Sequence, residues 1–463
     1  QTTPIQWFRD GRLPWWTRLS FHDHPPLFFL VNNVFATLFG DSRFVMRLPA
    51  ALAGILSLYF IYLIFRRVSK NDYVGVLGAV FLAVNHIHIW ISRSIGLESL
   101  LVFLIIFGIH AFLLFLEDRR YWYWVGLAMG LAMLAKYTAI ILPASLVLTG
   151  LIFRRDIFKS HHFYAAVVLS LAIFSPVLIY NAYLYRTTGH FDLQFAYLFG
   201  QETPEWRASI GKAQDPFSQI VPNVLAMFSL PALFLVLAGL IFSFRFRAEE
   251  RGVYPAMAWV FFITATLVLA ATGSAYRFLV LYAVPFVAFM IIAVLAIDKY
   301  FWKDRRLGLA CLAAFLAYEL WFSVSSIFIY FPSFGVVALD DYFDSELRGF
   351  ASSAFPTSPN PHINKIIQAN LLKLPVGEPA IAIVYDENLS LPHKLWVFGR
   401  RTVYKGVTAM TTTLFKDLLR VKGLDYLDGY RIYFVKASPD AALNQYFLTN
   451  EAARFEQFLL NEL

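Results

Sequence analysis

Glu98 is the residue of this chain whose position most favours catalysis. It follows Ile95-Gly96-Leu97 directly and begins a long apolar run. A carboxylate at that depth in an apolar segment usually faces a protein-lined or water-filled cavity, where it can take a proton as a general base. The structural alternative is that Glu98 stabilises the N-terminus of a helix, where an anionic side chain interacts favourably with the helix dipole.

Cationic and phenolic side chains lie at the ends of other apolar runs. The candidates are Arg93, Lys136 with Tyr137, and Arg277. Phosphate recognition uses Arg forks and Lys point charges, so these residues are interpreted as a site for the phosphate of a lipid-linked sugar. Glu98 would then act as the base toward an acceptor hydroxyl. Anchoring at the membrane interface is the alternative for each cation, because Tyr, Lys and Arg commonly lie there.

Histidines suggest a second kind of site. The pattern His-x-His occurs twice, at residues 22–24 and 86–88. With Glu98, the side chains of His86 and His88 could bind a divalent metal ion; imidazole suits zinc, whereas magnesium and manganese prefer oxygen ligands. Sequence does not bring the two histidine pairs together, and interfacial histidines are common. A protein without any cofactor is therefore the alternative.

The elements that must position these residues are membrane helices. Of the 463 residues, 59% are hydrophobic and 15% are charged, too few charges to cover the surface of a soluble fold. The single cysteine also excludes a disulfide scaffold. A helix needs about 20 apolar residues to cross a bilayer. The candidate spans are 48–65, 74–92, 98–116, 121–135, 138–153, 163–183, 222–243, 254–272, 276–297 and 307–329.

The loops between these spans alternate between basic and charge-poor. The basic loops lie at 66–70, 117–120, 154–159, 245–251 and 299–306. Short basic loops stay in the cytoplasm, so residues 1–47, the 184–221 loop and the chain after residue 329 are expected outside it, at the cell membrane. The net charge of +8 therefore reflects topology and does not indicate nucleic-acid binding.

Two domains are expected: a membrane domain over residues 1–329 and an extracytoplasmic α/β domain over residues 330–463. In the first, the segment 27–39 is apolar but too short to span, which predicts an interfacial helix in the outer leaflet. In the second, the patterns predict strands at 380–385 and 430–435 and helices at 413–421 and 441–460. The fold class is thus a polytopic α-helical membrane protein with a C-terminal α/β domain.

Several short motifs follow one another in the first part of the chain. They are His24-Pro25-Pro26-Leu27, Leu38-Phe39-Gly40, Arg47-Leu48-Pro49-Ala50, Ser92-Arg93, Glu98-Ser99-Leu100-Leu101 and Ala135-Lys136-Tyr137. Together they resemble the dolichyl-phosphate-mannose protein mannosyltransferase family, and within it most resemble the bacterial branch that includes the lipid A aminoarabinose transferase. The resemblance covers residues 20–150 well and the later spans by hydropathy alone.

The resemblance implies a GT-C fold and an inverting glycosyltransferase. Such an enzyme moves a sugar from a polyprenyl-phosphate donor in the membrane to an extracytoplasmic acceptor, which can be a protein, a lipid or a glycan. It places Glu98 at the second acidic position of the family and His24 near the donor phosphate. Lys136 and Arg277 match further cations that face the phosphate, and some relatives bind a divalent cation.

The chain departs from the family at the first acidic position. Relatives carry an Asp-Glu pair before the Pro-Pro element, and they have a span upstream of it. Here Asp10 and Asp23 are the only acids before His24, neither has the family's context, and the sequence begins at Gln1. We therefore expect a fragment that lacks the first span and the principal acid, or an enzyme in which Asp23 has taken over the catalytic role.

Two other classes of protein share this hydropathy. A secondary transporter or lipid flippase would have the same topology, although transporters usually show two similar halves and broken helices near the midplane. A noncatalytic membrane scaffold that presents the 330–463 domain is the third hypothesis.

Overall fold

The protein is described from a computed structural model. It describes residues 24–40, 42–201, 217–246, 253–300, 305–330, 335–346, 351–352, 368, 371–372, 375–377, 380–389, 393–437 and 450–462. The described chain forms two compact units, a helical unit over residues 24–330 and an α/β unit over residues 335–462. Each unit is presented separately.

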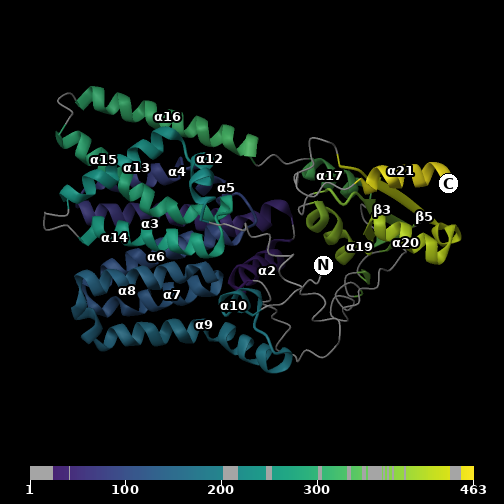
Figure 1. Ribbon diagram of the computed structural model, residues 1–463, viewed down its shortest axis with the longest axis horizontal. Coiled ribbons are helices and arrows are strands. Elements are labelled where there is room, and N and C mark those ends of the chain that lie inside the picture. Colours follow the sequence, from purple (N-terminus) through teal and green to yellow (C-terminus); the bar gives the residue numbers. More distant parts are fainter. Residues whose placement is uncertain are drawn as a thin grey trace. The chain divides into compact units, whose positions relative to one another are not determined.

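The first unit is a bundle of apolar helices (Figure 1). Six of its described helices are long and apolar enough to cross a membrane, and the number is up to eight if each of two bent pairs is one span. The six are α3 (Arg43–Ser69), α6 (Leu97–Glu117), α9 (His161–Thr188), α14 (Val253–Thr272), α15 (Ala283–Tyr300) with the preceding 3₁₀ segment η5 (Tyr276–Tyr282), and α16 (Arg305–Tyr330). The polytopic helical fold predicted from the sequence is confirmed.

Two predicted spans are broken rather than straight. Segment 74–92 forms α4 (Asp72–Ala83) and α5 (His86–Ser92), which meet at 70°. The Asn85 side chain caps α5 by accepting a hydrogen bond from the backbone N–H of His88 at 3.1 Å, so the chain restarts as a new helix there.

Segment 222–243 forms α12 (Ile220–Met227) and α13 (Leu230–Phe246), bent by 119°. Here the Ser229 hydroxyl accepts from the N–H of Ala232 at 3.1 Å. Small polar residues inside apolar runs cause both breaks. An averaged hydropathy does not reveal these breaks.

Shorter helices complete the unit. They are α2 (Leu27–Phe39), α7 (Trp122–Ala135), the 3₁₀ segment η3 (Tyr137–Ile140), α8 (Ile141–Phe153) and α10 (Leu193–Leu198). The helix predicted at 27–39 is confirmed as a helix. The two predicted spans around Lys136 are the separate helices α7 and α8, and both are shorter than a full crossing.

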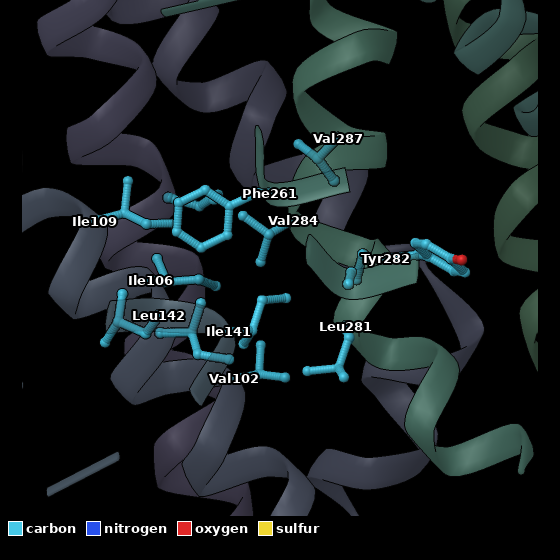
Figure 2. Packing of buried hydrophobic residues seen from close by; sticks show 14 of the residues in the cluster. Val102, Ile106, Ile109, Ile141, Leu142, Phe261, Leu281, Tyr282, Val284 and Val287 are labelled. Carbon is cyan, nitrogen blue, oxygen red and sulfur yellow. The ribbon is translucent and has the colours of Figure 1, made fainter. Parts of the chain in front are cut away.

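Helix α6 lies at the centre of the hydrophobic core. Val102, Ile106 and Ile109 project from it at helical spacing toward Ile141 and Leu142 of α8, and Phe261 of α14 and Val284 of α15 pack on the same cluster (Figure 2). At Gly108 an added Cβ would come within 2.6 Å of Leu142, so only glycine permits this approach of α6 to α8. The core therefore fixes the helix that begins with the candidate base.

The second unit contains a parallel sheet. Its strand order is β4-β3-β5, with β3 (Ala380–Tyr385) in the centre, β4 (Thr408–Thr411) on one side and β5 (Tyr430–Val435) on the other. Both strands predicted from the sequence are confirmed, whereas β4 was missed because it is short and has no apolar alternation. A two-residue pairing joins β1 (Ala351–Ser352) to β2 (Val376–Gly377).

Helices pack around this sheet. They are α17 (Val336–Glu346), the π-helical turn η6 (His393–Gly399), α19 (Arg400–Lys405), α20 (Thr412–Lys422), the 3₁₀ turn η7 (Leu424–Leu427) and α21 (Glu451–Glu462). The helix predicted at 413–421 is α20. The one predicted at 441–460 is helical from Glu451, and its residues 441–449 lie outside the described part of the chain.

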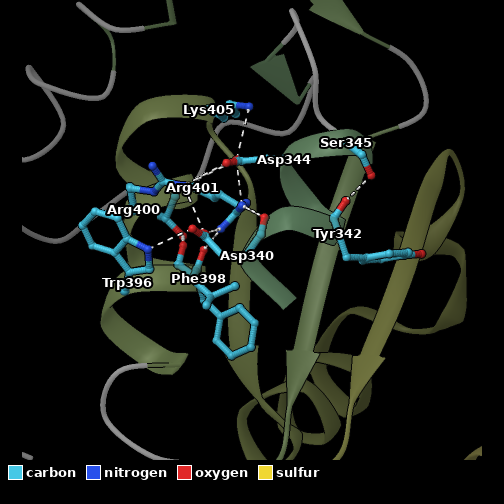
Figure 3. Close-up of polar contacts among 11 residues, drawn as sticks. Asp340, Tyr342, Asp344, Ser345, Trp396, Phe398, Arg400, Arg401 and Lys405 are labelled. Carbon is cyan, nitrogen blue, oxygen red and sulfur yellow. Dashed lines mark hydrogen bonds and ion pairs between the residues drawn. The ribbon is translucent and has the colours of Figure 1, made fainter. Parts of the chain in front are cut away.

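A buried ionic cluster ties α17 to η6 and α19 (Figure 3). The Arg401 guanidinium donates to Asp340 Oδ1 at 2.7 Å and to the Asp340 carbonyl at 2.6 Å, and Trp396 Nε1 donates to Asp340 Oδ2 at 2.9 Å. Burial alone would raise the pKa of the Asp340 carboxyl, but the bonds from Arg401 and Trp396 and the nearby Arg400 charge lower it overall. Asp340 is thus held as a carboxylate that joins these elements.

Candidate active site

Glu98 forms a buried ion pair with Lys136. The Lys136 ammonium donates to Glu98 Oε1 at 2.7 Å, and only about one-twentieth of each side chain is exposed, 5% for Lys136 and 6% for Glu98. Glu98 lies in the first turn of α6, after Gly96 in an extended conformation. Lys136 lies at the break where α7 ends and η3 begins, also with extended backbone. This break in the helix directs the Lys136 ammonium toward the Glu98 carboxylate.

Arg277 approaches the same carboxylate from η5. Its Nε is 3.4 Å from Glu98 Oε1, and its side chain is 51% exposed. The ring of Phe278 lies beneath both cations, 4.1 Å from Lys136 Nζ and 5.0 Å from the Arg277 guanidinium carbon. Cations over an aromatic face are stabilised by its quadrupole. The structure thus brings together three residues that the sequence analysis assigned to one site.

A second group of cations lies at the same end of the bundle. The charge of Arg47 is close enough to those of Arg93 and Arg43 to interact with each of them. Arg43 and Arg47 belong to the first turns of α3, and Arg93 follows α5. The start of α3 is linked to the start of α6 because the Ser99 hydroxyl donates to the carbonyl of Ala50 at 2.6 Å. Three like charges near the Glu98 end of α6 create a positive field that favours an anion.

Tyr137 points to a different partner from the one expected. Its hydroxyl donates to the carboxylate of Asp192, which also accepts from Asn181 Nδ2 at 3.0 Å and from the Phe195 N–H at 3.0 Å. Asp192 is completely buried, and burial raises the pKa of its carboxyl. Sequence reasoning missed Asp192. An acid just after Gly189, where α9 ends, was the available signal.

The proposed metal ligands do not converge. His86 packs edge-on against Phe322, with ring centroids 5.4 Å apart, and the buried Nε2 atoms of His86 and His88 have no hydrogen-bond partner among the described residues. Glu98 faces cations instead. In the described part of the chain no three His, Cys, Asp or Glu side chains form a metal-binding group. The described structure therefore does not bring Glu98, His86 and His88 together, because the His86 ring packs against Phe322 while Glu98 pairs with Lys136 and Arg277.

The remaining candidates lie at the N-terminal end of the unit. His24 is half-buried just before α2, while Asp23 and His22 lie outside the described residues. Glu319 lies within α16, and the Ser229 hydroxyl donates to its carboxylate. That carboxylate is structural, since it joins α16 to the bend between α12 and α13.

Comparison with known proteins places this arrangement in a known fold. Residues 23–180 match the family model described as dolichyl-phosphate-mannose-protein mannosyltransferase. The structure of ArnT from Cupriavidus metallidurans matches with a TM-score of 0.51 and 17% identity, over 88% of this chain and 79% of that one. The chain has a GT-C fold.

Two further proteins are similar to this chain. The archaeal oligosaccharyltransferase AglB from Archaeoglobus fulgidus matches with a TM-score of 0.51 and 13% identity, over 88% of this chain and 59% of that one. A putative mannosyltransferase, YycA of Bacillus subtilis (strain 168), is 32% identical over 88 residues, which is 19% of this chain and 12% of the Bacillus protein. That aligned segment is thus a small part of the relative's length. The GT-C resemblance inferred from the motifs is confirmed.

Proposed function

We propose that this chain transfers a sugar from a polyprenyl-phosphate donor to an acceptor outside the cytoplasm, at the cell membrane. The observation that carries the proposal is the buried Glu98 carboxylate with Lys136 and Arg277 on one of its oxygens, at the end of an apolar bundle. The fold agrees with this reaction. ArnT was also solved with undecaprenyl phosphate, and AglB with a dolichol-phosphate.

The cations act on the charge that develops during transfer. The acceptor oxygen attacks the anomeric carbon with inversion, and the bond from that carbon to the phosphate oxygen breaks. The donor is a phosphodiester with one negative charge, and the released polyprenyl phosphate gains a second. Lys136 and Arg277 are positioned to stabilise this added charge, and stabilisation of developing charge is commonly the largest catalytic effect.

The ion pair also implies an order of events. Glu98 Oε1 accepts a hydrogen bond from Lys136 and is paired with Arg277, so in the free protein this oxygen is occupied by cations and is not ready to take a proton. An incoming phosphate competes for Lys136 and Arg277, and Arg277 is half-exposed and available to move. Once the phosphate binds the cations, Glu98 is released to accept the proton of the acceptor hydroxyl, alone or together with Asp23.

The arginine cluster and His24 extend the donor site. Arg43, Arg47 and Arg93 form a positive region near the same end of α6, which suits the approach of an anionic head group. His24 precedes α2 at the position that the family motif assigns to a phosphate neighbour. Tyr137 has a structural role in this proposal, because its hydroxyl is committed to Asp192.

A lipid flippase is favoured by one observation. The bent pairs α4–α5 and α12–α13 have the form of the broken helices common in secondary transporters. A flippase would move the lipid-linked sugar across the membrane and leave the bond between sugar and phosphate intact. The two functions therefore predict different chemical products.

The test is a transfer assay with the full-length protein in membranes. Isolated cell envelopes supply the acceptor, and a panel of polyprenyl-phosphate sugars with a labelled sugar supplies the donor. Glu98→Gln is expected to lower transfer by about 100-fold or more, the contribution typical of a general base. Glu319→Gln is the matched control, because it removes another buried carboxylate of the same unit and should leave transfer within a few-fold.

The outcomes separate the hypotheses. Full activity in Glu98→Gln would remove this residue from the mechanism. Movement of intact donor between leaflets, without release of polyprenyl phosphate, would favour the flippase.

A further inference from the structure

A polar cavity lies at the end of α6 opposite Glu98. It has a volume of about 370 Å³ and is lined by Arg66, Arg67, Lys70, Asn71, Asp72 and His110. His110 is twelve residues beyond Glu98 in α6, which corresponds to about 18 Å along the helix axis. The cavity is therefore separate from the candidate active site.

The cavity has an excess of cations. Arg66 Nε pairs with Asp72 Oδ1 at 2.6 Å, and Arg67 pairs with Glu117 of α6. Each guanidinium has five N–H donors, so one carboxylate leaves donors of each side chain available. Lys70 has no hydrogen-bond or ion-pair partner among the described residues.

Lys70 also occupies an unusual backbone position. It ends α3 with φ 56° and ψ 33°, and it is the one non-glycine residue with positive φ in the described part of the chain. Gly or Asn adopts this left-handed conformation at lower cost. Placing a lysine there retains an ammonium group at the cavity in spite of the strain.

A buried polar atom lies without a partner at the same cavity. His110 is 8% exposed, and its Nδ1 has no hydrogen-bond partner among the described residues. A buried donor or acceptor without a partner costs free energy. A ligand with oxygen atoms in the cavity would satisfy it.

An aromatic strip leads away from the cavity along the bundle. The Phe60 ring contacts His110 with centroids 5.5 Å apart, Phe107 lies 5.1 Å from Phe60, and Trp124 lies 5.7 Å from Phe107. Phe103 stacks on Phe107 one turn further along α6. These rings are partly exposed and form an apolar surface beside a phosphate-sized cationic site.

We propose that this cavity binds the phosphate of an anionic glycerophospholipid, whose acyl chain lies on the aromatic strip. The basic loop 66–70 is one of those that the charge pattern assigns to the cytoplasmic side, where anionic lipids attract clustered Lys and Arg. The phosphate oxygens are held by Arg66 and Lys70, with His110 at the base of the cavity. The site does not depend on the transfer reaction proposed above.

The test measures lipid retention by the purified full chain in neutral detergent. Native mass spectrometry would compare dioleoyl phosphatidylglycerol with dioleoyl phosphatidylcholine, and at least tenfold tighter retention of the anionic lipid is expected. The double variant Arg66→Gln with Lys70→Asn should weaken phosphatidylglycerol binding about 25-fold, at about fivefold for each charge removed. Asn accepts the backbone conformation of residue 70, and both changes are at exposed side chains, so folding should be retained.

The control is the double variant Arg120→Gln with Arg155→Gln. These exposed cations belong to neighbouring basic loops and do not line the cavity, so phosphatidylglycerol binding should be unchanged. Equal binding of the two lipids, or equal loss in both double variants, would overturn the proposal. Displacement of the lipid by millimolar inorganic phosphate, beyond that caused by sodium chloride of equal ionic strength, would assign the site to free phosphate and overturn the lipid assignment.

Discussion

Lys136 Nζ lies 2.7 Å from Glu98 Oε1, and this contact joins two helix ends that are 38 residues apart in the sequence. Each of these charges would be costly to bury alone, and together they form a pair with Arg277 at its exposed side. The pair therefore links the two helix ends and also provides positive charge that a phosphate ligand can bind.

The first prediction concerns the stability of this pair. Lys136→Met should destabilise the protein by about 3 kcal/mol, because it leaves a buried carboxylate with only the longer contact to the half-exposed Arg277. Adding Glu98→Gln to Lys136→Met should recover part of that loss. Thermal unfolding in detergent of the two single variants and the double variant measures the coupling. Additive effects would show that the two side chains do not interact.

The second prediction concerns Arg277. Arg277→Gln should lower kcat/KM for the lipid-linked donor about 10- to 100-fold, the range expected when one charge-assisted hydrogen bond to phosphate is lost. Stability should change little, because the side chain is half-exposed. Arg186→Gln, an exposed arginine in the last turn of α9, is the control and should behave as wild type. A loss of stability without a loss of turnover would contradict the assigned role.

The third prediction distinguishes Tyr137 from the phosphate-binding cations. Tyr137→Phe removes the hydroxyl that donates to Asp192, so unfolding should become easier by about 1–3 kcal/mol. Donor KM should remain close to wild type. Steady-state kinetics together with thermal unfolding separate the two effects. A raised donor KM with unchanged stability would return Tyr137 to the phosphate site.

The fourth prediction concerns pH and the second unit. The folded protein lowers the pKa of Asp340, so this carboxylate stabilises the fold at pH values above its unfolded pKa of about 3.9. The stabilisation is lost as pH falls from that value through the lower folded pKa. Asp340→Asn should therefore be less stable at pH 7 and show a weaker loss of stability in acid. Unfolding midpoints between pH 7 and pH 3, with the exposed Asp417→Asn as control, provide the measurement.

The sequence identified Glu98 and Lys136 as candidate site residues, but it did not predict the contact between them. Glu98 and Lys136 were recognisable because charged residues are rare next to apolar runs, and such residues face the protein interior. Their pairing depends on how α6 and η3 meet, which is a tertiary contact. The spacing of His86 and His88 likewise does not reveal that the His86 ring packs against Phe322 and not beside Glu98.

The fold could likewise be predicted from the sequence only in part. Strand β3 was readable because it is a continuous apolar run, and β5 because its residues alternate in character over a full strand length. The breaks at Asn85 and Ser229 depend on single capping hydrogen bonds and are invisible to an averaged hydropathy. Asp192 was missed for a related reason, because its burial is created by contacts with Tyr137 and Asn181 from other segments.

The enclosure of α6 determines which parts of the site can adapt to different sugars. Since α6 is held on several sides by the core and cannot shift without disrupting close contacts such as Gly108 against Leu142, Glu98 is a fixed reference point. Lys136 instead lies at the helix break before η3, and Arg277 lies in the 3₁₀ segment η5. A 3₁₀ segment is less stable than an α-helix. Changes in donor selectivity should therefore be obtained by remodelling η3 and η5, with α6 left untouched.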